Sequence, residues 1–457
     1  MTTARKLPTT LLLMYALGQF GWALQVEIIN ALLIYFYQPP KVANLPQLLP
    51  EATYFGFLSL FTVLVVVSKL YEAALNPIVA GISDSWRGRW GRRIPFMAVG
   101  MLPAVLGCYL LFMPPDATPT TLNLVWFLGA NVLFLTGLTL YVNPHNALLI
   151  ELGHDEKERL RISIAISVTY ALGVLGATFA PSIWAYLQTA HGLDKVRAVQ
   201  VAIGLLCVVS LVFMSLPVLF LPEKRYSAAS PGSEKILDSL RATLGNKRFR
   251  VFLFSDFAYW IGSTIVVSGL MYYITVLLTL PESTLAEMMT ILFVVSFGFY
   301  PLVNWLSSKG VSRKGMIQAC FLTFAGLFGF IFVLGDGLPI PLYTQGVIVM
   351  VLAAVPIATL GILPNTILAD ISELDSLENG VNRQGMYFAV RSIGIRLGYV
   401  VGIFIFLLLL QLGKDVGDDL GIRCTGIAGV VVNLLAFLLF LTYDERKVME
   451  KIYALRK

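Results

Sequence analysis

Residues 72–96 read EAALNPIVAGISDSWRGRWGRRIPF and join two long apolar segments. The stretch carries four arginines, Arg87, Arg89, Arg92 and Arg93, with Gly81, Asp84 and Gly91 around them. Short loops rich in arginine and lysine between membrane-length helices lie on the cytoplasmic side of a membrane. The stretch therefore predicts a protein whose chain crosses the membrane several times.

The composition of the rest of the chain agrees with a membrane protein. Of 457 residues, 57% are hydrophobic and 13% are charged, whereas soluble domains average about 25% charged residues. A spanning helix needs about 20 apolar residues, and twelve segments qualify. They are 10–37, 52–82, 94–113, 123–150, 162–189, 198–221, 250–279, 287–307, 314–334, 341–369, 385–411 and 421–443. Backbone groups in lipid must be satisfied internally, and no alternating strands of about ten residues occur. We therefore expect an all-α membrane protein.

The distribution of basic residues predicts the orientation. The two termini and the five loops expected on their side hold 25 of the 33 lysines and arginines, and the opposite loops hold five. By the positive-inside rule both termini are cytoplasmic, in the inner or plasma membrane of the cell. The net charge of +6 thus reflects topology, and no nucleic-acid partner is expected. The three remaining basic residues, Lys69, Arg391 and Arg396, lie inside predicted spans.

The sequence contains no recognisable signal peptide or metal motif. The first apolar stretch is too long for a cleavable signal and lacks a small-residue cleavage site. Cys108, Cys207, Cys320 and Cys424 lie in different spans without metal-ligand spacing, so neither a disulfide nor a metal site is expected. We expect no cofactor, and partners limited to a solute and membrane lipid, with a monomeric protein.

Two related motifs indicate an internal repeat. Asn146-Ala-Leu-Leu-Ile-Glu151 and Asn365-Thr-Ile-Leu-Ala-Asp370 are separated by close to half the length of the chain, and each follows a proline. The basic loop has a weaker echo in Lys309-Gly310 and Arg313-Lys314-Gly315. We predict six-helix bundles over residues 1–221 and 250–457, joined by a cytoplasmic linker over 222–249. In transporters built from two such repeats the solute binds between them near the membrane midplane.

Several motifs together resemble one family of transporters. They are Tyr71-Glu72 and Asn76-Pro77, the run from Gly81 to Pro95, Asn143-Pro144-His145-Asn146, Ala369-Asp370, and Arg383-Gln384-Gly385-Met386-Tyr387. They are similar to the glycoside–pentoside–hexuronide:cation symporter family of the major facilitator superfamily, whose best-known type is melibiose permease. The resemblance implies two pseudo-symmetric six-helix bundles and cation-coupled symport by alternating access. Lysolipid symporters and plant sucrose carriers share these motifs, so they do not define the solute.

Lys69, Glu72 and Asn76 share one face of the second span, because helical periodicity places them within a narrow arc. The resemblance places Glu72 and Asn76 where the family has two cation-binding aspartates, and Arg396 where it has a lysine near the cation. Because a sodium site needs several hard, preferably anionic oxygens, the amide at Asn76 weakens it and favours H⁺. The alternative is a static pair of Glu72 with Lys69 or Arg396 that only joins two helices.

The predicted substrate-binding residues come from four spans. Gln19, Glu27 and Asn30 share one face of the first span with Trp22 nearby, and Asp256 and Tyr259 share one side of the seventh. The full set is Gln19, Trp22, Glu27, Asn30, Asn143, Asp256, Tyr259, Tyr387 and Arg391. Ordinary interhelical hydrogen bonds, or pairing of an arginine with Glu27 or Glu72, are the alternatives. The galactosyl-binding aspartates of melibiose permease align with Ala23 and Val142, which makes a simple galactoside doubtful.

A third group of charged residues lies at the predicted cytoplasmic helix ends. It comprises Asp84, Arg92, Arg93, Glu151, Arg159, Asp370 and Arg383. The resemblance implies that these residues form salt bridges in one state of the transport cycle and break them in the other. The alternative is that the arginines only set topology.

We therefore expect a secondary active transporter, not an enzyme, coupled to H⁺ or Na⁺ and moving a sugar-like or glycoside solute. One alternative is a transporter of an amphipathic or anionic solute such as a lysolipid, bound through Arg391 or Arg396. The other is a facilitator-like scaffold or receptor that has lost coupling, suggested by Asn76.

Overall fold

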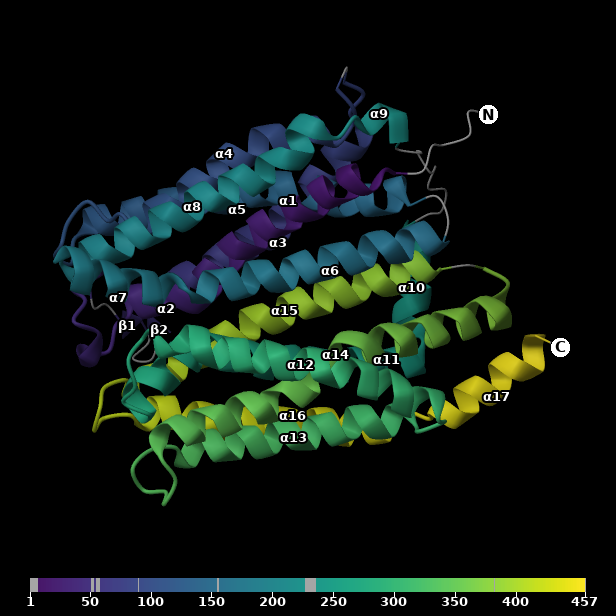
Figure 1. Cartoon of the computed structure of the whole chain (residues 1–457). Coiled ribbons are helices and arrows are strands. Elements are labelled where there is room, and N and C mark those ends of the chain that lie inside the picture. Colours follow the sequence, from purple (N-terminus) through teal and green to yellow (C-terminus); the bar gives the residue numbers. More distant parts are fainter. Residues whose placement is uncertain are drawn as a thin grey trace. The chain divides into compact units, whose positions relative to one another are not determined.

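The computed structural model describes residues 7–50, 53–54, 58–88, 90–153, 156–226, 236–381 and 383–456. Within these ranges the side chains of Asp84 and Arg159, both predicted gate residues, lie outside the described set. Twelve of the described helices, some of them built from consecutive segments, are long and apolar enough to cross a membrane, which confirms the predicted fold class. Figure 1 shows them as long ribbons.

The first six spans are built from eight helices. They are α1 (Thr9–Ile28) continued by the π-helical turn η1 (Ile29–Leu33) and α2 (Ile34–Tyr37), then α3 (Leu60–Ser85), α4 (Ile94–Leu111), α5 (Thr121–Leu152), α6 (Glu156–Thr178) with α7 (Ala180–His191), and α8 (Lys195–Phe220). The short η2 (Lys41–Ala43) and the paired two-residue strands β1 (Thr53–Tyr54) and β2 (Leu58–Ser59) lie between α2 and α3.

The last six spans follow two short helices, α9 (Glu223–Tyr226) and α10 (Ile236–Gly245). They are α11 (Lys247–Tyr272) continued by the π-helical η3 (Tyr273–Leu277), α12 (Thr284–Ser308), α13 (Arg313–Val333), α14 (Leu342–Asn379), α15 (Gln384–Leu410) and α16 (Leu420–Leu441), after which α17 (Glu445–Arg456) ends the described chain.

Three spans differ from the predicted ranges. The second begins at Leu60 and not at residue 52, because the residues before it form the small β1–β2 hairpin. The fifth is broken at Phe179, where Pro181 supplies no N–H to the preceding turn. The tenth continues to Asn379, well beyond the predicted end at residue 369, so that α14 extends past its apolar stretch into a polar one.

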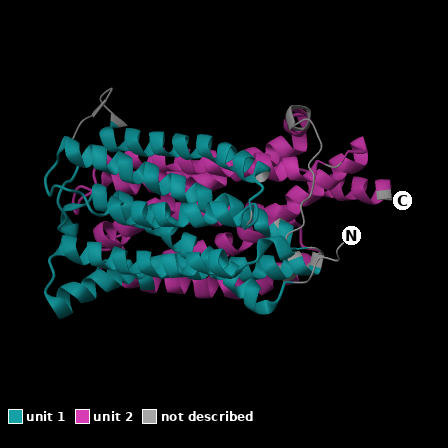
Figure 2. Cartoon of the chain, turned by 90° about the horizontal axis from the view of Figure 1, so that it is seen from above, with its two compact units in different colours: residues 1–231, 281–286 teal, residues 232–280, 287–457 magenta. Residues whose placement is uncertain are grey.

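The chain divides into two compact units, which Figure 2 colours separately. Unit 1 holds Met1–Pro231 together with the short segment Pro281–Ala286, and unit 2 holds Gly232–Leu280 and Glu287–Lys457. The division falls inside the predicted linker, since α9 belongs to unit 1 and α10 to unit 2. The predicted six-helix bundles over residues 1–221 and 250–457 stay a prediction.

Glycines bring helices into backbone contact within each unit. In unit 1, a Cβ added to Gly137 of α5 would lie 2.2 Å from the backbone nitrogen of Ala104 in α4. In unit 2, a Cβ on Gly426 of α16 would lie 2.6 Å from the backbone carbonyl oxygen of Phe328 in α13. Small residues allow such close approach of helices, which supplies packing energy in lipid. These pairs are therefore fixed parts of their units.

Candidate functional site

In unit 1, α1 presents polar groups next to aromatic rings. The side chain of Gln19 is 7% exposed, and its Oε1 and the Nε1 of Trp22 are buried without a hydrogen-bond partner among the described residues. The Trp22 ring lies 5.6 Å from that of Tyr170 on α6. Buried polar groups in native proteins are normally paired, so these two atoms are candidates for hydrogen bonds with a ligand.

Glu27 and Asn30 continue this face of α1. Glu27 is 8% exposed and has no ion pair with a described residue of unit 1. It lies just before η1, and Asn30 lies within that turn. A buried carboxylate without a cation is costly, and π-helical turns frequently occur at functional sites. Both observations keep Glu27 a candidate for a functional role.

The predicted cation-coupling residues of α3 also lie together. The Nζ of Lys69 is 3.1 Å from Oε2 of Glu72, the amide nitrogen of Asn76 donates to the Glu72 carbonyl at 2.7 Å, and that of Asn143 on α5 donates to the Asn76 carbonyl at 3.2 Å. Both amide nitrogens are thus used, while no described residue donates to either side-chain oxygen. The structure contains the Lys69–Glu72 pair that the alternative interpretation expected.

In unit 2, Asp256 and Arg391 form a buried ion pair. The Nε of Arg391 is 2.9 Å from Oδ2 of Asp256, and its Nη2 donates to Oδ1 at 3.0 Å. Its Nη1 donates to Oδ1 of Asn365 at 2.5 Å, and the guanidinium lies over the ring of Phe252. Side-chain exposures of 9% and 5% make this a desolvated pair. Because all three guanidinium nitrogens are occupied, Arg391 is not open to an anionic solute in this structure.

The other three predicted residues of unit 2 differ in their surroundings. Tyr259 lines a small cavity next to Asp256. Tyr387 is fully buried, its hydroxyl accepts from the Asn246 amide at 2.9 Å, and its ring packs on Phe249, which argues against direct contact with a solute. Arg396 is exposed and has no carboxylate within salt-bridge distance among the described residues of unit 2.

Glu151 forms the predicted salt bridges at one end of unit 1. Its Oε1 accepts from Nη2 of Arg92 at 2.7 Å and from Nε of Arg93 at 3.0 Å. Arg93 also donates from Nη1 to the hydroxyl of Ser83 at 2.8 Å. Both Arg93 and Glu151 are 8% exposed, so this cluster is buried enough to contribute more than a surface pair.

Unit 2 repeats this arrangement with different residues. Asp370, the counterpart of Glu151, pairs with Nη1 of Arg313 at 2.6 Å, and Arg313 is the counterpart of Arg92 in the echoed loop. Arg383, which the sequence groups with Asp370, pairs instead with Asp375 at 3.5 Å. The two motifs are thus alike in their ion pairs as well as in their sequences.

Two glutamates that the sequence analysis did not select complete these clusters. The Glu223 carboxylate accepts from the backbone N–H groups of Arg92, Arg93 and Ile94, at the start of α4. The Glu445 carboxylate accepts from the N–H groups of Arg313 and Lys314 at the start of α13. The separation of the two glutamates along the chain nearly equals that of the repeated motifs. A comparison of the two halves of the sequence could therefore have identified them as a matching pair. Unpaired N–H groups at a helix start attract such carboxylates.

Twelve spanning helices with charged and polar side chains buried between them define a membrane transporter. The chain belongs to the family described as MFS/sugar transport protein, whose model matches residues 14–421. It is not an enzyme. An isoprimeverose transporter of Lactiplantibacillus pentosus is 24% identical, over 88% of this chain and 80% of its own. An uncharacterised symporter of Synechocystis sp. is 22% identical over 90% and 86%, and a putative glycoside/cation symporter of Escherichia coli is 27% identical over 41% and 40%.

Solved structures confirm the fold. A chain from a study of substrate recognition in proton-dependent oligopeptide transporters aligns over 98% of this chain and 99% of its own, with a TM-score of 0.64 and 14% identity. The nucleoside transporter NupG aligns over 96% and 100%, with a TM-score of 0.60 and 13% identity. At these identities the likeness concerns the fold alone.

Proposed function

We propose that this transporter carries an uncharged sugar or glycoside together with a cation. The observation that carries the proposal is the face of α1, where Gln19 and Trp22 hold buried, unpaired polar atoms and the Trp22 ring packs beside Tyr170. Amide and indole groups beside an aromatic ring suit a ligand with hydroxyl groups on an apolar ring face. The relatives named as an isoprimeverose transporter and a glycoside/cation symporter support the same solute class.

The state of the intramembrane cations favours an uncharged solute. Lys69 is paired with Glu72, and Arg391 with Asp256 and Asn365. An anionic solute would have to displace a carboxylate from either cation, with a desolvation cost. The one observation in favour of an anionic solute is Arg396, exposed and unpaired among the described residues of unit 2.

Coupling is proposed to use Glu72, with Asn76 and Asn143 beside it and Glu27 as a second carboxylate. A carboxylate can bind either a proton or, with several neighbouring oxygens, a metal cation. A cation bound by Glu72 would take the place of Lys69 as its partner, so cation binding would change the charge on this face of α3.

Uptake into proteoliposomes tests the proposal. Radiolabelled isoprimeverose, xylose and a lysophospholipid are offered under an imposed proton gradient, a sodium gradient and neither. We expect gradient-driven accumulation of a sugar, lost in a Gln19→Ala, Trp22→Phe variant that folds. Accumulation of the lysophospholipid alone, abolished by Arg396→Ala, would favour the anionic solute. Equilibration without accumulation under every gradient would show an uncoupled facilitator.

A further inference from the structure

Glu282 lies in an unusual place for an acidic loop residue. It belongs to Pro281–Ala286, which follows α11 and η3 of unit 2 but packs as part of unit 1. Acidic residues in short loops are usually solvated, yet the Glu282 side chain is only 11% exposed. An acid buried in a loop needs partners that compensate for its desolvation.

Three donors from three elements converge on this carboxylate. The hydroxyl of Tyr35 on α2 donates to Oε1 at 2.9 Å, and Nε1 of Trp184 on α7 donates to Oε2 at 2.7 Å. The Nζ of Lys195, the first residue of α8, also contacts Oε2 and lies over the Trp184 ring. Hydrogen bonds to charged groups are the stronger ones, so this clasp fixes the segment to the ends of three helices.

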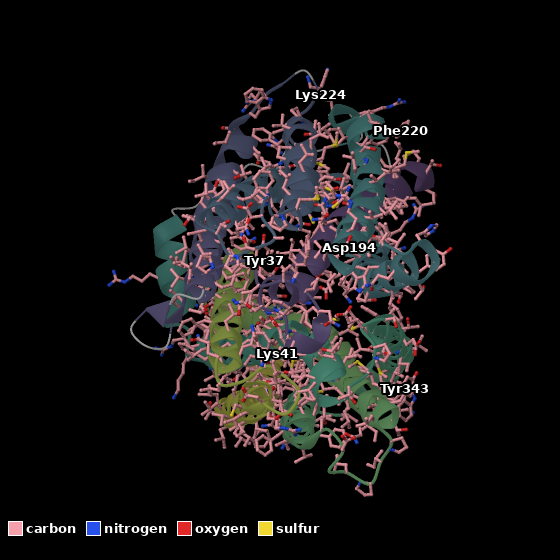
Figure 3. All side chains as sticks on the ribbon, turned by 90° about the vertical axis from the view of Figure 1, so that its left-hand side faces the viewer. Tyr37, Lys41, Asp194, Phe220, Lys224 and Tyr343 are labelled. Carbon is pink, nitrogen blue, oxygen red and sulfur yellow. The ribbon has the colours of Figure 1, made fainter. Side chains whose placement is uncertain are left out.

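Neighbouring residues extend the attachment. The hydroxyl of Ser182 donates to the carbonyl of Ser283 at 3.2 Å, and Leu285 and Ala286 are 0% and 4% exposed. Figure 3 looks onto the side where α2 ends at Tyr37 and where Asp194 precedes α8, both of which it labels. The charge distribution predicts this side to be extracellular.

The backbone on either side of the segment determines what happens when the units move. On one side stand η3 and Thr279, which has a positive φ of 48°, a conformation that a β-branched residue adopts only under constraint. On the other side α12 runs from Thr284 into unit 2 without a break. An intact helix cannot stretch, so Glu282 cannot stay on unit 1 if α12 moves away from it.

We propose that the Glu282 clasp is an extracellular gate: it holds Pro281–Ala286 on unit 1 and must release each time the transporter opens on the side opposite its termini. The release step rests on the proposed transport function, because alternating access requires the two repeats to rock against each other. The clasp itself does not depend on which solute or cation is carried.

The first experiment tests the clasp without any solute. Ala286→Cys is the reporter, in the full chain with Cys424→Ser, because the other three cysteines are buried. Its labelling by a maleimide in detergent is timed for the parent, for Glu282→Gln and for Trp184→Phe. We expect both variants to label about tenfold faster, since each removes a strong hydrogen bond that favours the closed state.

The neighbouring Glu287 supplies the matched control. It is exposed and lies next to the reporter, so Glu287→Gln removes the same charge near the thiol without touching the clasp. We expect Glu287→Gln to label at the parental rate. Equal labelling rates for the parent, Glu282→Gln and Trp184→Phe, with all three folded by thermal unfolding, would overturn the clasp.

The second experiment tests whether release is needed for transport. A Ser182→Cys, Ser283→Cys pair is joined by a short bifunctional thiosulfonate and then freed by reductant. We expect solute exchange to fall at least about tenfold when the pair is joined and to recover on reduction, because a gate held shut limits the cycle. Full exchange by the joined protein would overturn the gate. No exchange of any solute by the freed protein would instead count against the proposed function.

Discussion

At the scale of single residues, the substitution Glu72→Gln is the first test of cation coupling. Glu72→Gln keeps the shape of the side chain but removes the group that binds H⁺ or Na⁺ and pairs with Lys69. We expect gradient-driven accumulation of solute to be lost while solute exchange across the membrane persists, as measured in proteoliposomes. Glu287→Gln, on an exposed carboxylate, should leave both unchanged. Normal accumulation in Glu72→Gln would transfer the coupling role to Glu27.

The buried pair Asp256–Arg391 gives a second residue-scale prediction. Asp256→Ala leaves a buried guanidinium without its carboxylate and should lower the free energy of unfolding by about 3 kcal/mol. The double change with Arg391→Ala should cost less than the two single changes together. A thermodynamic cycle from thermal unfolding in detergent measures the difference.

The exposed pair Arg446–Glu450, with side-chain exposures of 91% and 69%, is the reference for that cycle. Its coupling free energy should be about 0.5 kcal/mol or less. Equal coupling in the buried and exposed pairs would mean that Asp256 and Arg391 do not interact strongly in the folded protein.

The sequence identified these residues as candidates but not their partners. Asp256 and Arg391 both qualify because charges inside spans are costly, yet they are 135 residues apart and no periodicity relates the two helices. Glu282 was missed because acidic residues are common in exposed loops. Only the structure shows that this side chain is largely shielded from solvent. Asn365 was noted only as part of a repeated motif, and its contact with Arg391 requires the structure.

At the scale of helices, the carboxylate of Glu223 is expected to stabilise the start of α4. Three backbone N–H groups donate to it, so Glu223→Ala should lower the free energy of unfolding by about 2 kcal/mol. Glu445→Ala should have a similar effect on α13. Glu450→Ala, which removes an exposed charge from α17, should change the midpoint of thermal unfolding little. A midpoint for Glu223→Ala equal to that of Glu450→Ala would contradict this role.

Helix positions were predictable from apolar length, and the exceptions have local causes. The break at Phe179 follows from Pro181, a signal present in the sequence but hidden inside a continuous apolar run. The extension of α14 to Asn379 is polar, and its last turns are held by ion pairs of Asp375 and Glu378. The apolar length of a segment predicts only the part of a helix that lies in lipid. It does not predict a polar extension such as the end of α14, which depends on ion pairs with other parts of the chain.

At the scale of the whole molecule, the next prediction concerns which ion drives transport. With one carboxylate and one amide on the face of α3 shared by Glu72 and Asn76, we expect H⁺ to drive uptake better than Na⁺. Measuring solute accumulation at constant pH with and without sodium, and then at constant sodium across a pH gradient, separates the two. Strong sodium stimulation at constant pH would instead indicate that the side-chain oxygens of Asn76 and Asn143 help to complete a metal site.

The predicted repeat would account for the similar contacts in two distant parts of the chain. Glu151 with Arg92 in unit 1 and Asp370 with Arg313 in unit 2 occupy corresponding places, and Glu223 and Glu445 cap corresponding helices. The motif that begins with Asn146 and Asn365 predicts the duplication, which stays a prediction. It could not predict that Arg383 would pair with Asp375, because that contact has no counterpart among the described residues of unit 1.

The position of α17 has a practical consequence for anyone who expresses this protein. Its Glu445 caps α13, its Val448 and Ile452 are buried, and its Lys451 pairs with Glu378 of α14. An affinity tag fused after the last residue leaves all of these in place. Trimming the chain from Asp444 onward, a common way to shorten a membrane protein for crystallisation, would uncover an apolar strip and remove the cap of α13, so poor yield from such a shortened version would say nothing about transport.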